Sequence, residues 1–166
     1  GYIHLKVIPG ASKDHIKHAM QLADRVSINI EAATKDGLSD LSSTKNYDTD
    51  ILKRLDWIDR LHKKNHSLAS SGHTTQIIVG ANEENDEDIL NRIDYLKKKY
   101  NVLYNYFSSF RPIKGTPLEN HEACDNKRTG RLYQMEYLFS KYNFTKKDIV
   151  LDDNGFLDLN NDPKYN

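Results

Sequence analysis

Three polar side chains alternate with aliphatic ones in a segment that ends in a carboxylate. Ser27, Asn29 and Glu31 lie between valine and isoleucine residues across positions 25–31. Because successive side chains of a strand point to opposite faces, these three share one face. A hydroxyl, an amide and a carboxylate on one face can hydrogen-bond a polar ligand, or form a network that only shapes the core. A ligand site is the sharper hypothesis, because sites of parallel barrels gather at the carboxyl ends of strands.

A second segment, residues 74–83, has the same character. It is expected to be a strand that ends in glycine and leads directly into an acidic helix start. Gln76 and Ile78 share one face, and Gly80 follows at the strand end. Gly80 also suits an ordinary turn, and Glu83 also suits a helix start, where acidic side chains complement the helix dipole.

Two further pairs complete the candidate site. His4 and Lys6 share the polar face of an expected strand at 2–8. Tyr104 and Tyr106 share a face of another at 102–110, where tyrosine is also a common packing residue. We interpret these four side chains as facing a ligand or substrate.

Helical patterns separate the expected strands along the chain. Strands are predicted at 2–8, 25–31, 74–79 and 102–110, and helices after Ser12, from 48 or 49, from 82, and over 130–142; residues 32–46 and 112–129 are expected to be irregular. Strands joined through helices pair in parallel. The strands of an open doubly wound sheet read as continuous apolar runs, whereas these alternate.

The sequence therefore predicts an α/β fold, specifically a partial TIM-like (β/α) barrel of parallel strands with outer helices, incomplete at both ends. Lys6 and Glu31 in a dry interior would cost several kcal/mol unless paired or solvated. A lumen that holds a polar ligand avoids this cost. We expect one domain over 1–166, with four strand–helix units in 1–111 and a linker, a final helix and a tail in 112–166.

Composition narrows the function classes. Lysine plus arginine and aspartate plus glutamate are both 24, so the net charge does not favour broad electrostatic binding of nucleic acid. No apolar run is long enough to span a membrane. The single cysteine, Cys124, excludes an internal disulfide and favours a cytoplasmic setting; it is expected to be a surface thiol. The sequence begins within a strand and its last residues, 162–166, close no element, so we expect a piece of a longer protein.

Several unusual strings occur in an order that resembles a known family. They are Gly1–Ala11, Leu22–Glu31, Thr74–Ala81, Ser109–Pro112 and Arg131–Gln134. Together they span almost the whole chain and are similar to the DNA modification or repair group of radical S-adenosylmethionine (SAM) proteins, of which this segment resembles the third to sixth barrel strands.

The resemblance implies a chemistry. Such enzymes reductively cleave SAM at a [4Fe-4S] cluster and generate a 5′-deoxyadenosyl radical, here with modification or repair of nucleic acid as the implied purpose. It implies that Ser27, Asn29 and Glu31 contact SAM. It also implies that Ile78 lies against the adenine and that Gly80 lets the backbone approach SAM. These residues match the later part of the family's GxIxGxxE pattern, but Gln76 stands where that pattern has its first glycine.

The cluster loop of the family, CxxxCxxC, is absent. A cluster of this kind needs three thiolates from its protein, and one cysteine cannot supply them. The resemblance thus implies that the cluster ligands lie upstream, that this segment alone is inactive, and that its partner is the rest of its own polypeptide, including a downstream extension. No metal ligand and no catalytic residue is assigned.

Two other functions stay open. A non-catalytic, truncated barrel module could serve in binding or assembly, and the missing thiolates favour it. A cluster-free barrel enzyme, an aldolase or hydrolase, could use Lys6 and Glu31 as acid and base; it would show a lysine of depressed pKa or a bound phosphate.

Overall fold

A computed structural model describes residues 1–162, and the expectation about the chain's last residues therefore lies largely outside it. In chain order the elements are β1 (His4–Lys6), α1 (Lys13–Leu22), β2 (Arg25–Ser27), α2 (Lys35–Leu41), the π-helical turn η1 (Tyr47–Leu52), α3 (Lys53–Lys64), β3 (His73–Val79), α4 (Asp86–Tyr100), β4 (Tyr104–Ser109), α5 (Asn126–Lys141) and the 3₁₀ turn η2 (Lys146–Asp148). The α/β class is confirmed.

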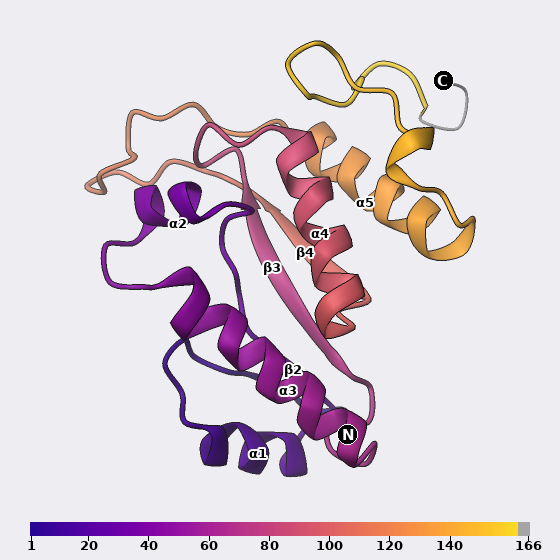
Figure 1. Ribbon diagram of the computed structural model, residues 1–166. Coiled ribbons are helices and arrows are strands. Elements are labelled where there is room, and N and C mark those ends of the chain that lie inside the picture. The colour runs from indigo at the N-terminus through magenta and orange to yellow at the C-terminus, as the bar shows by residue number, and fades with distance from the viewer. Residues whose placement is uncertain (163–166) are drawn as a thin grey trace.

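The strands form one parallel sheet in the order β1-β2-β3-β4. Lys6, Ser27, Thr74 and Tyr104 are partners in one row across it. Right-handed crossovers that always advance in the same direction put every connecting helix on one face. Figure 1 shows this arrangement, with α3 and α4 in front of the strands.

The aliphatic face of the sheet packs on these helices. Fully buried strand residues join fully buried helix residues in one cluster, which includes Val26, Ile28, Ile30, Ile77, Val79, Ile16, Met20, Leu55, Ile58, Ile89 and Leu96. Burial of each such side chain is worth about 1.5–3 kcal/mol. The core therefore fixes which face of every strand looks away from the helices.

Helix starts follow their capping residues. The Ser12 hydroxyl accepts a hydrogen bond from the His15 N–H (3.2 Å), as expected. The third long helix does not begin near residue 82: Asn85 and Asp88 form a capping box, which starts α4 at Asp86. Asp125 caps α5, so the last helix starts at residue 126 rather than 130.

Residues 32–46, expected to be a loop, contain the helix α2. Its start is held by the buried carboxylate of Glu84, which accepts hydrogen bonds from the N–H groups of Ala33 (2.9 Å) and Thr34 (2.6 Å) and from the Thr34 hydroxyl (2.7 Å). The helix expected from residue 82 would have placed Glu84 in its first turn. Glu84 instead joins the loop after β3 to the segment before α2.

The second strand is shorter than predicted, because its continuation leaves register with β3. Ser27 pairs with Thr74 and Glu31 with Ile77, so four residue steps oppose three. The Thr75 hydroxyl fills the gap: it donates to the Ile28 carbonyl (2.7 Å) and accepts from the Ile30 N–H (3.1 Å). A side chain thus replaces the missing ladder bonds.

The two sheet edges differ. Along the outer edge of β4, the N–H of Asn105 donates to Glu136 Oε1 (2.7 Å) and that of Phe107 donates to the Tyr133 hydroxyl (2.9 Å), both from α5. On either side of β1, the Ile3 carbonyl accepts from the Arg25 N–H and the Val7 N–H donates to the Ser27 carbonyl, so the N–H groups of His4 and Lys6 point away from the sheet. No described residue accepts from them. An edge of this kind is open to a further strand.

Candidate functional site

Two of the predicted site residues, Asn29 and Gln76, meet on one face of the sheet. Asn29 and Gln76 are half-buried on the face away from the helices, and the Asn29 Nδ2 donates to Gln76 Oε1 (3.4 Å). Ser27, 4% exposed, and half-buried Ile78 lie on the same face. The two amides are therefore joined to each other while still reachable from the open side of the sheet.

Glu31 leaves this row: it is the register partner of Ile77, a core residue, and its backbone conformation is uncommon. Its φ is +63°, in the left-handed region, although its N–H and carbonyl still bond to β3. Such residues cost roughly 1–3 kcal/mol and gather at functional sites. The half-buried carboxylate lies 3.5 Å from Lys45 Nζ, so a cation from the segment after α2 faces it.

Gly80 has a structural reason to be glycine. Its φ is +79°, and an added Cβ would lie 2.8 Å from the Cβ of Cys124. Cys124 is 7% exposed, so the expectation of a surface thiol is wrong; it packs where a side chain of residue 80 would be. Burial raises the pKa of this thiol.

The amino end of the same face is cationic. His4 and Lys6 are exposed, and Arg25 pairs with His4 in the register of the sheet. Partial burial, and then Arg25 and Lys6, lower the pKa of His4. The Arg25 guanidinium lies 6.0 Å from the ring centre of Tyr104, which is half exposed, as is Tyr106. These side chains could receive an anionic or aromatic group.

Three residues of this face were not singled out from sequence. Thr74 is fully buried in the row of Ser27 and Tyr104, and its hydroxyl has no hydrogen-bond partner among the described residues. Arg25 and Lys45 bring the charges described above. The alternation pattern could have found Arg25 and Thr74, which lie two residues from Ser27 and Gln76. Lys45 could not be found this way, because it comes from a segment without a pattern.

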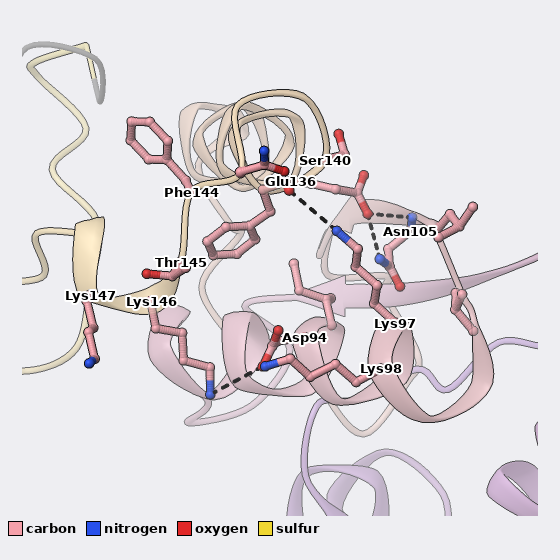
Figure 2. A pocket seen from close by; sticks show the side chains of 15 residues that line it. Asp94, Lys97, Lys98, Asn105, Glu136, Ser140, Phe144, Thr145, Lys146 and Lys147 are labelled. Atoms are coloured by element: carbon pink, nitrogen blue, oxygen red, sulfur yellow. Dashed lines mark hydrogen bonds and ion pairs between the residues drawn. The ribbon is translucent and has the colours of Figure 1, made fainter.

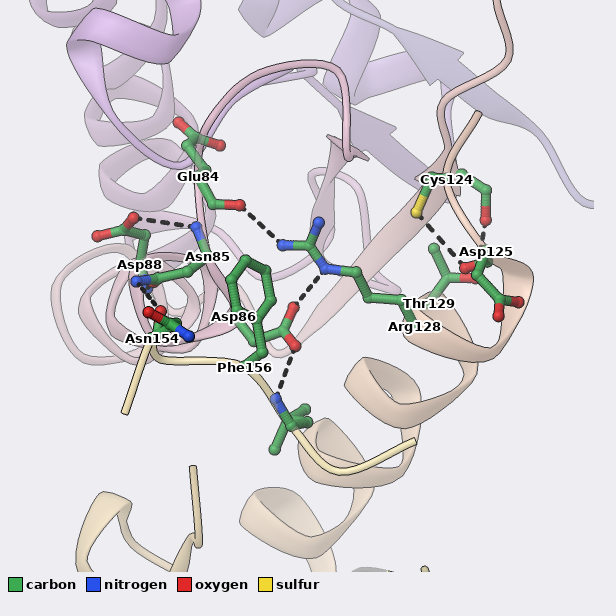
Figure 3. Close-up of polar contacts among 12 residues, drawn as sticks. Glu84, Asn85, Asp86, Asp88, Cys124, Asp125, Arg128, Thr129, Asn154 and Phe156 are labelled. Carbon is green, nitrogen blue, oxygen red and sulfur yellow. Dashed lines mark hydrogen bonds and ion pairs between the residues drawn. The ribbon is translucent and has the colours of Figure 1, made fainter. Parts of the chain in front are cut away.

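The loops at the carboxyl edge are fastened by a buried ion pair (Figure 3). Arg128 Nε donates to Asp86 Oδ1 (2.7 Å) and its Nη2 donates to the Glu84 carbonyl (2.8 Å). The other Asp86 oxygen accepts from the Leu157 N–H (2.9 Å), and the Phe156 ring lies 4.9 Å from the guanidinium. This ion pair joins the start of α4 to the start of α5 and to the C-terminal segment.

The side chains available in this part of the chain determine whether it could bind a metal ion, a cluster or an organic ligand. Among residues 1–162 no group of three histidine, cysteine or acidic side chains could bind a metal ion. Cys124 cannot hold an iron–sulfur cluster alone. The hydroxyl, amide and carboxylate groups around Asn29 instead suit an organic ligand with several hydrogen-bonding groups.

No family model, curated protein or solved structure matches the chain. Within the described residues no helix is both long and apolar enough to cross a membrane. The fold and site together define an α/β protein with a polar face on a four-stranded parallel sheet.

Proposed function

We propose that this chain is the distal part of a radical SAM barrel and that the polar face of its sheet contacts SAM. The observation that carries the proposal is the arrangement of the strands: four parallel strands follow one another in chain order, with their aliphatic sides toward the helices and their polar sides on the other face. This order supports part of a TIM-like barrel over a complete doubly wound sheet, which reverses its strand order.

The edges of the sheet support the same proposal. Side chains of α5 seal β4, so the sheet ends there, while β1 presents free N–H groups to a further strand. Upstream strands of the same polypeptide would pair with β1 and would bring the cluster ligands. The first partner that we propose is therefore the rest of the same polypeptide. We also propose that the whole enzyme is cytoplasmic.

The side chains present fit SAM by their chemistry. Asn29, Gln76 and Ser27 offer hydrogen-bonding groups for its ribose and its amino acid part, and Glu31 adds a carboxylate. Ile78 offers an apolar surface for adenine, whereas Cys124 packs against Gly80, where the resemblance implies a backbone contact with SAM. When bound beside a reduced cluster, SAM supplies the 5′-deoxyadenosyl radical that removes a hydrogen atom from substrate. His4, Lys6, Tyr104 and Tyr106 would then face SAM or substrate, and a nucleic acid is the proposed substrate class.

The test uses the full-length protein, expressed anaerobically and reconstituted with iron and sulfide. We expect SAM-dependent release of 5′-deoxyadenosine after reduction, strongly reduced by Asn29→Ala together with Gln76→Ala. Lys64→Ala, an exposed residue at the end of α3, is the matched control. A fully loaded protein that never cleaves SAM would contradict the proposal.

A second candidate is a non-catalytic barrel module used in binding or assembly, and the free edge of β1 favours it. A partner could add a strand there, as in β-strand addition. The discriminating observation is the sequence encoded before Gly1, because a CxxxCxxC motif there favours the enzyme. An aldolase or hydrolase is not favoured, since Lys6 is exposed and Glu31 faces Lys45.

A further inference from the structure

A cleft of about 560 Å³ lies between the C-terminal halves of α4 and α5, beside the turn η2 (Figure 2). It is at the amino edge of the sheet, opposite the edge where Glu31 and Gly80 lie. Its volume is within the range of small-molecule sites. The proposed SAM site does not use it.

Exposed lysines gather at this cleft. Four of its lining residues are of this kind: Lys97, Lys98, Lys146 and Lys147. Lys97 Nζ lies 3.4 Å from the Phe139 carbonyl oxygen, a neutral acceptor, and within the described residues it forms no ion pair. Like charges repel, so a gathering of ammonium groups at one cleft favours an anionic ligand.

The carboxylates of the lining do not balance these cations. Lys98 Nζ (2.7 Å) and Lys146 Nζ (3.9 Å) share one oxygen of Asp94. Figure 2 shows both lysines directed toward this carboxylate. The other acid, Glu136, accepts from the N–H (2.7 Å) and the Nδ2 (2.5 Å) of Asn105 and thus serves the edge of β4. The cleft therefore keeps positive charge that the surrounding side chains leave unbalanced.

The walls beside the lysines are aromatic and hydrogen-bonding. Phe139 and Phe144 are half-buried, so both side chains keep surface toward the cleft. Ser140, Asn143 and Thr145 are exposed and line the same cleft. Aromatic rings stack on nucleobases of any kind, and hydroxyl and amide groups bond to sugar hydroxyls.

We propose that this cleft binds a free nucleoside phosphate. The base would pack on Phe139 and Phe144, and a ribose hydroxyl would bond to Ser140. The phosphates would pair with Lys97 and Lys146, because ammonium groups bind phosphate by charge-assisted hydrogen bonds. A simple anion would leave the aromatic walls unused, and an uncharged aromatic compound would leave the cations unbalanced. A nucleotide satisfies both.

The test is calorimetric titration of the 166-residue chain with ATP, ADP, AMP and adenosine. We expect saturable one-site binding that strengthens about threefold or more with each phosphate. Raising the ionic strength from roughly 0.01 M to roughly 0.15 M should weaken the binding of ATP but not that of adenosine, because salt screens the phosphates from the lysines. Tripolyphosphate, which has no base, should bind at least about fivefold more weakly than ATP.

Two variants test the residues. Phe139→Leu keeps an apolar side chain but loses the ring, so it should weaken ATP about fivefold or more and leave tripolyphosphate unchanged. Lys97→Met keeps the apolar stem and loses the charge, so it should weaken both ligands about threefold or more. Lys64→Met, at the end of α3, is the matched control and should change neither.

Three results would overturn the proposal. They are no saturable binding of ATP by the folded protein, equal binding of ATP and tripolyphosphate, and an affinity for ATP that Lys97→Met leaves unchanged. A single-stranded oligonucleotide that binds more tightly than ATP would overturn it as well, because the cleft would then belong to a surface for nucleic acid.

Discussion

Removing one partner of the Asp86–Arg128 ion pair should strongly destabilise the protein. Asp86 is 1% and Arg128 14% exposed, so neither side chain can recover its hydration in place. Arg128→Met leaves a buried carboxylate with only the Leu157 N–H and also removes the bond to the Glu84 carbonyl. Breaking a buried pair from one side costs about 3–5 kcal/mol. That is a fifth or more of the stability of a typical domain, about 5–15 kcal/mol.

The assay is urea denaturation followed by circular dichroism. In thermal denaturation of a chain of this size, the same loss of free energy corresponds to a fall in Tm of roughly 6–20 °C. The matched control is Arg60→Met, which breaks an ion pair with Asp56 in which the arginine is 69% exposed and should cost only about 0.3–0.5 kcal/mol. The double variant Asp86→Asn with Arg128→Met should lose less than the sum of the two single variants. A loss below about 1 kcal/mol for Arg128→Met would refute this account of the anchor.

The remaining predictions concern burial, glycine and the sheet edges. Burial lowers the pKa of His73 from 6.5 to about 4, so as the pH falls the unfolded chain binds a proton at this histidine before the folded chain does. The stability contribution of neutral His73 should be complete above about pH 6.5 and should fall by about 3 kcal/mol as the pH decreases to about 4. Urea titrations at several pH values test this, because His73→Gln should lack this pH dependence. Gly37→Ala should cost about 1–3 kcal/mol, because the added Cβ overlaps the Glu84 carboxylate that holds α2. Gly130→Ala should instead stabilise α5 by up to about 1 kcal/mol, because nothing lies within 4 Å of the added Cβ. Equal changes in Tm for the two variants would contradict this reasoning. In amide hydrogen exchange Phe107 should be protected by the Tyr133 hydroxyl and Lys6 should exchange quickly, so the reverse order would show that the sheet ends at β1.

Local patterns were sufficient to locate the strands and their orientation, although β1 and β2 are shorter than the predicted 2–8 and 25–31. Alternation in the strand of Asn29 and in that of Gln76 predicted one aliphatic and one polar face, and the core has this arrangement. The parallel pairing followed from the helices between strands. These features depend on periodicity, which a single sequence displays.

What the sequence could not supply depends on contacts between distant residues. Glu84 was expected at a helix start because it sits in an acidic run, but its carboxylate bonds to Ala33 and Thr34, about fifty positions earlier. Cys124 was expected at the surface because its neighbours are polar, yet it packs against Gly80. The seal on the outer edge of β4 likewise depends on α5 side chains that reach back to Asn105 and Phe107.

The most direct test of the central claim is hydrogen–deuterium exchange of the reconstituted full-length protein, read by mass spectrometry with and without SAM. We expect SAM to slow exchange in peptides that contain residues 27–31 and 76–82, at the carboxyl edge of the polar face. Peptides from the second half of α5 should not change. Protection confined to α5, or no change near Asn29 and Gln76 at saturating SAM, would contradict the account.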